Sequence, residues 1–354
     1  MKLPDFPWDT LAPYGDRARR FPAGIIDLSQ GTPVDPTPDF IQRSLQENSN
    51  SPSYPVTAGT NELREALKKY SRDVLGASGD FDVLPTIGSK ELVAWLPTFL
   101  ESQTVLIPEI AYPSYKVGAL IAGAQVHEVG IDAAQWPNAD LTWINTPSNP
   151  TGRVHSKTEL LRTIEWARVS GRVLASDECY VPFPDTESPV SILSLTHGDN
   201  SNIIAVHSLS KRSNFAGYRG AFIVGDSALI KKLLEIRKHA GMMVPLPVQH
   251  AMTTALGDES HVLIQAERYR ARRKVLKSAL EKVGFTIEFS GAGLYLWCTR
   301  NESDWESVGW LADRGILATP GSFYGTAGSR YIRVALTATD MKISEAAERI
   351  IHGN

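Results

Sequence analysis

Hydrophobic and polar positions along the chain follow two different periods, and the change between them predicts its elements. Short apolar runs, typical of buried strands, recur at 83–87, 105–108, 141–144, 172–176, 202–206 and 221–224. Between them, apolar residues recur every three or four positions, as on one face of a helix. After Thr60, a good N-cap, the residues Leu63, Ala66, Leu67 and Tyr70 form such a stripe. This alternation predicts an α/β fold with a mostly parallel sheet between helices.

The two ends of the chain have a different pattern. Residues 1–39 are rich in proline and show no long periodicity, although a short apolar strand runs into Gly31. Near the C-terminus, short strands at 286–289, 294–298 and 331–336 alternate with helices at 305–313 and 343–351, after a long helix at roughly 266–283. We therefore expect a large domain of residues 40–250 and a smaller α+β domain made of residues 1–39 and 251–354.

Composition narrows the class of protein. The chain has 354 residues, of which 42% are hydrophobic and 21% are charged, as in ordinary soluble globular proteins. A net charge of −3 gives no reason to expect nucleic acid or an anionic membrane as a partner. No apolar run reaches the ~20 residues of a membrane span, and the start lacks a signal-peptide core. Cys179 and Cys298 are too few for a disulfide scaffold, and no metal-ligand motif is visible, so we expect a cytoplasmic protein without a metal.

One candidate for chemistry is Lys211, which follows the apolar run 202–206 within a segment of small hydroxyl residues. Burial disfavours the charge of a lysine and lowers its pKa, and such a lysine can form a Schiff base with a carbonyl. The aldehyde of pyridoxal phosphate (PLP) is the commonest partner. Arg219, with Gly217 and Gly220 close by, suits a phosphate. By itself the pattern fits a solvated lysine equally well.

Candidate polar residues also follow two other predicted strands, and one lies inside a strand. The glycine turn Gly88-Ser89-Lys90 runs into a helix with Ser89 as the expected N-cap, and a helix N-terminus can bind a phosphate. Asp177 follows the strand 172–176, where a buried carboxylate needs a cation such as a protonated ring nitrogen. Arg333 lies inside an apolar strand, where it either forms a salt bridge or binds a carboxylate.

Three further residues remain open from the pattern alone. Tyr112 follows a strand end and could stack on a planar cofactor or pack in the core. Tyr54 could be a surface aromatic or a ligand contact. The backbone at Gly31 could approach a substrate carboxylate or form an ordinary turn.

The order of these pieces is more specific than any one of them. Asn149-Pro150-Thr151-Gly152, then Asp177-x-x-Tyr180, then Ser208-x-Ser210-Lys211, then Arg219 and Arg333 together resemble the fold-type I PLP-dependent aminotransferases of classes I and II. The resemblance extends from about Gly31 to Arg333. It implies the PLP-dependent transferase fold of type I, with a large PLP-binding domain and a smaller α+β domain.

The resemblance also implies roles for the residues. Lys211 would form a Schiff base with PLP and then move a proton between the substrate Cα and the cofactor. Asp177 would keep the pyridine nitrogen protonated, while Tyr180 and Asn149 would hydrogen-bond the ring 3′-oxygen. Tyr112 would stack on the ring. The phosphate would be bound by Gly88, Ser89, Lys90, Ser208 and Arg219.

The resemblance also implies how the substrate is bound, how the chain assembles and how the reaction proceeds. Arg333 would bind the α-carboxylate of the amino acid, with the Gly31 N–H and Asn149 beside it. Tyr54 would reach the phosphate of the neighbouring subunit, so a homodimer is implied. The reaction would be ping-pong, with an amino acid and a 2-oxo acid using one pocket in turn.

Several segments without catalytic meaning are similar to one subfamily, the actinobacterial-type N-succinyl-L,L-diaminopimelate aminotransferases (succinyldiaminopimelate transaminases). They are Phe6–Asp9, Leu28–Pro36, Arg237–Pro245 and Val334–Asp340. This similarity implies a role in diaminopimelate and lysine biosynthesis, with glutamate as donor and 2-oxoglutarate as its product. His207 and Arg212 flank the lysine motif and receive no role.

Two alternatives stay open on the same fold. One is an aminotransferase for aspartate, alanine or an aromatic amino acid, and the other is a PLP-dependent C–S lyase. A PLP-binding transcription regulator is disfavoured, because only about 30 residues precede the Gly31 strand, too few for a helix-turn-helix domain.

Overall fold

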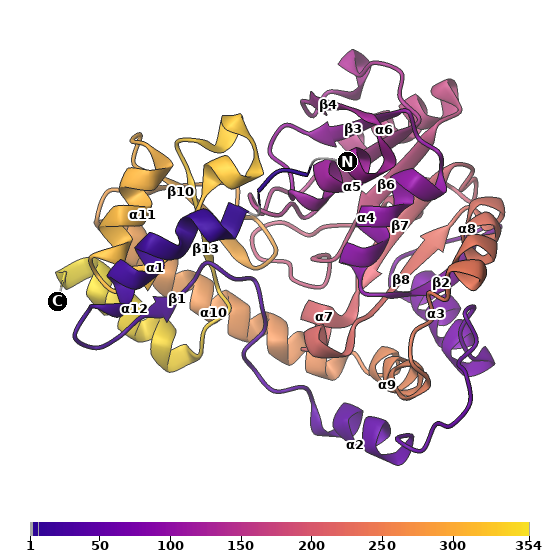
Figure 1. Cartoon of the computed structure of the whole chain (residues 1–354), viewed down its shortest axis with the longest axis horizontal. Coiled ribbons are helices and arrows are strands. Elements are labelled where there is room, and N and C mark those ends of the chain that lie inside the picture. The colour runs from indigo at the N-terminus through magenta and orange to yellow at the C-terminus, as the bar shows by residue number, and fades with distance from the viewer. Residues whose placement is uncertain (1–2, 6, 354) are drawn as a thin grey trace.

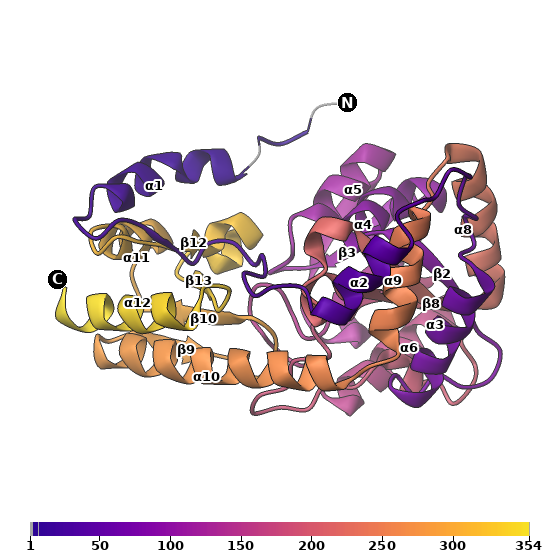
Figure 2. The ribbon, with the colours of Figure 1, turned by 90° about the horizontal axis from the view of Figure 1, so that it is seen from below.

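The computed structural model describes residues 3–5 and 7–353, which form two lobes joined by the long helix α10 and by the N-terminal segment (Figures 1 and 2). Phe6, part of the subfamily segment Phe6–Asp9, lies outside the described residues. Within the described residues, the larger lobe contains a seven-stranded sheet in the order β2-β8-β7-β6-β5-β3-β4. The strands are β2 (Asp82–Ile87), β3 (Thr104–Pro108), β4 (Gln125–Val129), β5 (Leu141–Asn145), β6 (Val173–Asp177), β7 (Ile203–Ser208) and β8 (Gly220–Gly225).

The predicted α/β fold with a mostly parallel sheet is confirmed. All the pairings from β7 through β6, β5 and β3 to β4 are parallel, whereas β8 runs antiparallel to both of its neighbours, β2 and β7. The edge strand β4 was not predicted, because its alternating polar residues do not form an apolar run. Its exposed edge position explains that composition.

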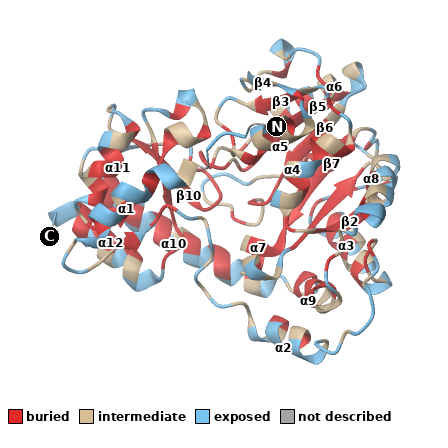
Figure 3. Cartoon of the chain, in the orientation of Figure 1, coloured by how far each residue is buried: buried red, intermediate tan, exposed pale blue. Residues whose placement is uncertain are grey.

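Helices cover both faces of this sheet (Figure 1). They are α2 (Asp39–Glu47), α3 (Asn61–Asp73), α4 (Ser89–Phe99), α5 (Ser114–Ala122), α6 (Lys157–Ser170), α7 (Leu209–Arg212), α8 (Ser227–Ala240) and α9 (Leu246–Leu256). Along β7, Ala205 packs in the core with α3, α6 and α9, while Ile204 and Val206 pack in the core with α4, α5 and α8. Because both faces are buried (Figure 3), the strand reads as one continuous apolar run.

Of the two predicted helix N-caps, one is confirmed and the other is wrong. Thr60 is the N-cap of α3, and its hydroxyl accepts a hydrogen bond of 3.2 Å from the Leu63 N–H, as predicted. The prediction that Ser89 caps α4 is wrong: the N-cap is Gly88, and Ser89 is the first helical residue. A φ of +75° at Gly88 lets the chain turn one residue earlier than a serine cap would.

The smaller lobe combines the N-terminal segment with the C-terminal part of the chain. Its helices are α1 (Ala12–Arg19), α10 (Ser260–Lys282), α11 (Asp304–Ala312) and α12 (Asp340–His352). Its strands are β1 (Ile26–Asp27), β9 (Thr286–Glu288), β10 (Tyr295–Thr299), β11 (Ile316–Leu317), β12 (Thr319–Pro320) and β13 (Ile332–Ala335). The antiparallel order β12-β13-β10-β9 lies beside the parallel pair β1-β11. One hydrophobic core joins Leu11 and Leu28 to α10 and α12, and the division at 39/40 and 250/251 stays a prediction.

Several helices were not predicted from the sequence pattern. The helices α1, α2 and α9 were not predicted, and α10 begins at Ser260, earlier than expected. Short 3-10 helices are η1 (Pro7–Leu11), η2 (Ala133–Gln135), η3 (Ile192–Leu195), η4 (Ala216–Tyr218), η5 (Gly321–Tyr324) and η6 (Thr326–Gly328). Among the described helices, none combines the length and the apolar character that crossing a membrane requires.

Candidate active site

The carboxyl ends of β5, β6 and β7 meet at one edge of the sheet, and the candidate residues follow from there. Asn145 of β5 lies beside Asp177 of β6, and Asp177 lies beside Val206 of β7. Lys211 comes five residues after Val206, in the short helix α7. Ser208 begins this helix by accepting a hydrogen bond of 3.1 Å from the Ser210 N–H. In open α/β sheets, ligands bind at this edge.

The antiparallel strand β8 explains why Arg219 joins this group. Since β8 runs against its neighbours, it starts where β7 and β2 end: Ala221 pairs with Ser208, and Gly220 pairs with Ile87. Gly88 therefore lies next to Arg219. A Cβ atom added at Gly88 would be only 2.2 Å from Nη2 of Arg219. The structure thus brings together the predicted phosphate residues Gly88, Ser208 and Arg219.

Asp177 is buried in surroundings that leave its charge without a counterion. Its Oδ2 accepts a hydrogen bond of 2.8 Å from the Tyr115 hydroxyl, and its Oδ1 accepts one of 3.2 Å from the Cys179 N–H. Burial raises the pKa of Asp177, while these hydrogen bonds oppose the rise. Across residues 3–5 and 7–353, no ion pair includes Asp177. A cationic ring nitrogen would supply the missing charge.

Lys211 has the environment of a reactive lysine. Its side chain is half-buried, and burial is the main cause that lowers its pKa. The positive charges of Arg333 and Arg219 lower the pKa further, whereas Tyr295 and Cys179 raise it. An amine whose pKa is lowered in this way is more readily deprotonated and nucleophilic.

Arg333, in β13 of the smaller lobe, contacts the loop that follows β5 in the larger lobe. Its Nη1 donates a hydrogen bond of 2.9 Å to Oδ1 of Asn149, and its Nη2 donates to the backbone carbonyl of Ser29. It forms no salt bridge in the described residues, so the structure does not favour that alternative. Its buried Nε has no partner there. A carboxylate would satisfy this donor.

Tyr180 and Tyr295 form a hydrogen-bonded pair in the centre of the site. Their hydroxyl oxygens are 2.9 Å apart. The hydroxyl of Tyr295 also reaches the backbone at Gly31, where an added Cβ atom would lie 2.0 Å from it. The glycine at position 31 is thus required by a close approach, which the sequence did not indicate.

The remaining predicted residues are more exposed than Asp177 and Arg333. Tyr112 is half-buried, and its ring meets that of Tyr115 edge-on at 5.8 Å. Ser89 is half-buried and Lys90 is exposed, both in the first turn of α4. Tyr54 is 92% exposed, and the single chain does not bring it into the site.

Sequence reasoning missed Tyr115, Cys179, Tyr295 and the carbonyl of Ser29. Tyr115 is the second residue of α5, three positions after Tyr112, and its nearness in sequence to a candidate residue could have indicated it. Tyr295 offered no such signal, because its partner Tyr180 is 115 positions away.

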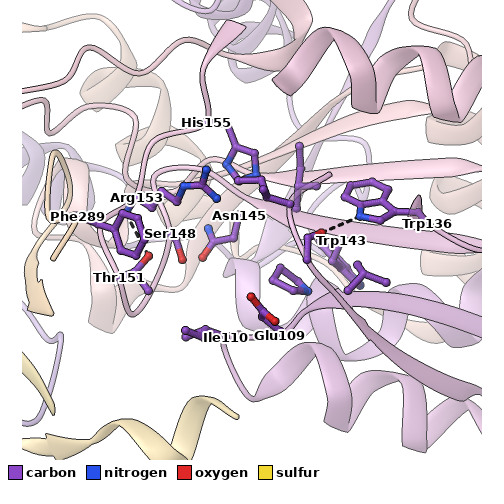
Figure 4. Close-up of a pocket in the computed structure, with 15 residues that line it drawn as sticks. Glu109, Ile110, Trp136, Trp143, Asn145, Ser148, Thr151, Arg153, His155 and Phe289 are labelled. Carbon is purple, nitrogen blue, oxygen red and sulfur yellow. Dashed lines mark hydrogen bonds between the residues drawn. The ribbon is translucent and has the colours of Figure 1, made fainter. Parts of the chain in front are cut away.

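A cavity of about 170 Å³ lies beside the site (Figure 4). It is lined by parts of the loops near Glu109 and Ser148, together with Arg153, His155 and Phe289. Burial, with the nearby charge of Arg153, lowers the pKa of His155 to about 4. The predicted site residues are not among its lining in the described part of the chain, so this cavity adjoins the site without being its centre.

The residues present fit a PLP molecule. The cradle at Gly88 and Arg219 suits a phosphate, the buried carboxylate of Asp177 suits a protonated pyridine nitrogen, and Lys211 suits the aldehyde. Among the described residues, no group of His, Cys, Asp and Glu side chains could hold a metal ion.

The chain is similar to known aminotransferases in sequence. The family model described as "Aminotransferase class I and II" matches residues 23–350. The chain is 48% identical to the 4-dedimethylamino-4-oxo-anhydrotetracycline transaminase OxyQ of Streptomyces rimosus, over 99% of both chains. It is 49% identical to the probable aminotransferase Rv1178 of Mycobacterium tuberculosis, over 98% of this chain and 85% of that one.

A solved structure shares the whole architecture. The probable N-succinyldiaminopimelate aminotransferase of Thermus thermophilus superposes with a TM-score of 0.90 at 27% sequence identity. The match covers 99% of this chain and 100% of that one.

Proposed function

We propose a specific reaction for this chain, which belongs to the class I and II aminotransferases: amino transfer between N-succinyl-L,L-diaminopimelate and the glutamate/2-oxoglutarate pair. Enzymes of this family depend on PLP. The observation that best supports amino transfer here is the meeting of Lys211, Asp177 and Arg333 at one edge of the sheet.

When bound, PLP would supply an electron sink for the Cα–H bond that breaks while an amino group moves from the donor to a 2-oxo acid. Lys211 holds the cofactor aldehyde and moves the proton at Cα. Its lowered pKa supports this role, because a neutral amine is a base. Asp177 keeps the ring nitrogen protonated, and its buried position makes the pairing strong.

Two groups of residues would hold the cofactor. Tyr180 and Asn149 would hydrogen-bond the ring 3′-oxygen, and Tyr112 would stack on the ring. Gly88, Ser208 and Arg219 would hold the phosphate, with Ser89 and Lys90 at the start of α4. The N-terminus of α4 adds its free N–H groups and its positive dipole end.

The substrate is held by the smaller lobe. Arg333 binds the α-carboxylate, with Asn149 and the Gly31 N–H beside it, and the unpartnered Nε of Arg333 supports this role. Tyr54 serves the neighbouring subunit of a homodimer, which accounts for a large aromatic side chain that is 92% exposed.

The succinylated substrate is supported by the subfamily segments and by the likeness to the Thermus thermophilus protein. Two charged residues of the segment Arg237–Pro245 are already paired. Arg237 is buried and forms an ion pair of 2.8 Å with Glu91, and Lys238 pairs with Glu235. We therefore assign neither residue to the distal carboxylates.

A second candidate function comes from the relative OxyQ. Its printed name describes a transaminase of a 4-oxo-anhydrotetracycline, and the 48% identity over 99% of both chains favours a large ketone as amino acceptor. Both candidates share the chemistry of Lys211 and differ in what the pocket accepts.

A half-reaction tests which amino donor the pocket accepts. The PLP-loaded protein is mixed with N-succinyl-L,L-diaminopimelate, glutamate, aspartate, alanine or phenylalanine, without an acceptor. We expect the absorption of bound PLP to be lost rapidly with the succinylated substrate and with glutamate, and slowly with the others. Rapid loss with another donor alone would overturn the substrate. Release of pyruvate, ammonia and a thiol from an added cysteine thioether would indicate a C–S lyase.

Lys211→Ala tests the chemistry itself. We expect this variant to keep PLP noncovalently but to lose the absorption of the lysine-bound cofactor and all turnover. Lys232→Ala, at an exposed lysine on α8, is the matched control and should behave as the wild type. Normal turnover by Lys211→Ala would remove Lys211 from the mechanism.

A further inference from the structure

We propose that Tyr295 is a positioning residue that couples two halves of the site: its hydroxyl orients Tyr180, and its ring supports Arg333. This inference rests on the aminotransferase function proposed above. Tyr295 is the first residue of β10 and is buried, and its hydroxyl and its ring contact different partners.

The hydroxyl of Tyr295 contacts Tyr180 at 2.9 Å. If Tyr180 donates its proton to the 3′-oxygen of the cofactor, its own oxygen can only accept, so Tyr295 is the donor within the pair. Burial raises the pKa of Tyr180 well above its ordinary value, which keeps the proton on Tyr180 available for donation. A hydrogen bond received by a hydroxyl strengthens the bond that it donates.

The ring of Tyr295 contacts Arg333. The guanidinium carbon lies 4.2 Å from the ring centroid, a distance typical of a cation–π interaction. The same guanidinium donates to Asn149. The ring therefore fixes the face of the arginine while Asn149 fixes its edge, and the group is preorganised for a carboxylate.

The backbone of Tyr295 is held on both sides. Ala335 of β13 pairs with it, and Nη1 of the buried Arg273 of α10 donates a hydrogen bond of 3.1 Å to its carbonyl. On the other side, Gly31 leaves room for the hydroxyl, since a Cβ atom there would be 2.0 Å away. With its backbone fixed and its hydroxyl confined, the side chain has little freedom, as a positioning residue requires.

In this proposal Tyr295 acts through Tyr180 and Arg333. Besides Arg273, the titratable and charged groups that face it are Tyr180, Lys211, Arg333, Tyr112, Tyr324 and Tyr269. The expected signature is therefore a change in the protonation of the bound cofactor together with an unchanged capacity to bind it.

The test is a pH titration of the absorption of PLP bound to Tyr295→Phe, which keeps the ring and removes the hydroxyl. Without its donor, Tyr180 bonds the 3′-oxygen more weakly, so the bound cofactor keeps its proton to higher pH. We expect an upward shift of about 0.5 to 1 pH unit, the range of one lost neutral hydrogen bond. The KM for the amino donor should stay within about twofold, whereas Tyr295→Leu should raise it roughly tenfold through loss of the ring under Arg333.

Tyr324→Phe is the matched control. Its ring is also near Arg333, at 5.2 Å, but in the described residues no hydrogen bond joins it to Tyr180. We expect its titration to follow the wild type. If Tyr295→Phe titrates as the wild type does, or if Tyr324→Phe shifts by the same amount, this inference is overturned while the proposed function stands. Failure of the wild-type protein to show any absorption of lysine-bound PLP would overturn the proposed function with it.

Discussion

The hydroxyl of Tyr115 donates a hydrogen bond to Oδ2 of Asp177 across 2.8 Å. Tyr115 is fully buried and its ring stacks on Trp143 at 5.0 Å, so the hydroxyl has one fixed direction. The backbone N–H of Cys179 holds the other carboxylate oxygen. The carboxylate that would face the ring nitrogen of the cofactor is thus oriented before any ligand arrives.

Tyr115→Phe removes this donor and leaves the packing in place. We expect the variant to lose about 1 kcal/mol of stability, the net contribution of a buried hydrogen bond, and to bind PLP less tightly. Chemical denaturation and a PLP titration measure the two effects. Phe222→Leu, in the other core of the sheet, is a control that should lower stability without changing PLP affinity. Unchanged PLP affinity in Tyr115→Phe would show that Asp177 is oriented without Tyr115.

Asp177→Asn should have opposite effects on function and on the stability of the PLP-free protein. The pKa of Asp177 is raised by burial, so the folded protein binds this proton more tightly than the unfolded chain does. The carboxyl therefore favours folding only at acidic pH. That contribution is lost as the pH rises from the ordinary aspartate pKa through the raised one. Above the raised pKa, the wild type contains a buried charge that asparagine lacks.

The measurement is the Tm of the two PLP-free proteins at pH 5 and pH 8. We expect Tm of Asp177→Asn minus Tm of the wild type to be more positive at pH 8, while turnover falls by a factor of roughly 100 or more. A difference that does not depend on pH would contradict an uncompensated charge at Asp177.

Gly88→Ala tests the phosphate cradle. Its φ of +75° is unfavourable for alanine, and the new methyl group would displace Arg219. We expect the Kd for PLP to rise roughly tenfold, since one charge-assisted contact is worth about 1.5–3 kcal/mol. Gly123→Ala is a matched control, because Gly123 also has a φ of +75° but nothing lies within 4 Å of its added Cβ. Equal PLP affinities of the two variants would argue against the cradle.

Arg333→Ala should weaken binding of the amino-acid substrate. Loss of a buried charged contact costs about 2–5 kcal/mol, so the KM for every amino donor should rise at least roughly 30-fold. Arg333→Lys keeps the charge but loses the guanidinium group that donates to Asn149, so its KM should lie between those of the wild type and Arg333→Ala. Arg330→Ala, at an exposed arginine just before β13, should leave the KM unchanged. If KM is unaltered in Arg333→Ala, the arginine is structural.

The sequence by itself determined the fold class and the chemistry at the strand ends. Strands that are buried on both faces must be continuously apolar, so the sequence pattern shows where each strand begins and ends. Polar residues that directly follow such strands must lie at the edge of the sheet. Asp177, Lys211, Arg219 and Arg333 could therefore be singled out as candidates from local pattern, and the resemblance added Asn149 and the role of each residue.

Tertiary structure alone decided which side chains meet. Tyr115 contacts Asp177 across 62 positions, Tyr180 contacts Tyr295 across 115, and Asn149 contacts Arg333 across 184. No local period relates such residues, because their meeting is set by the order of strands in the large sheet and by how the smaller lobe packs on the larger. The same holds for Gly31, whose missing side chain is explained only by the hydroxyl of Tyr295 that takes its space.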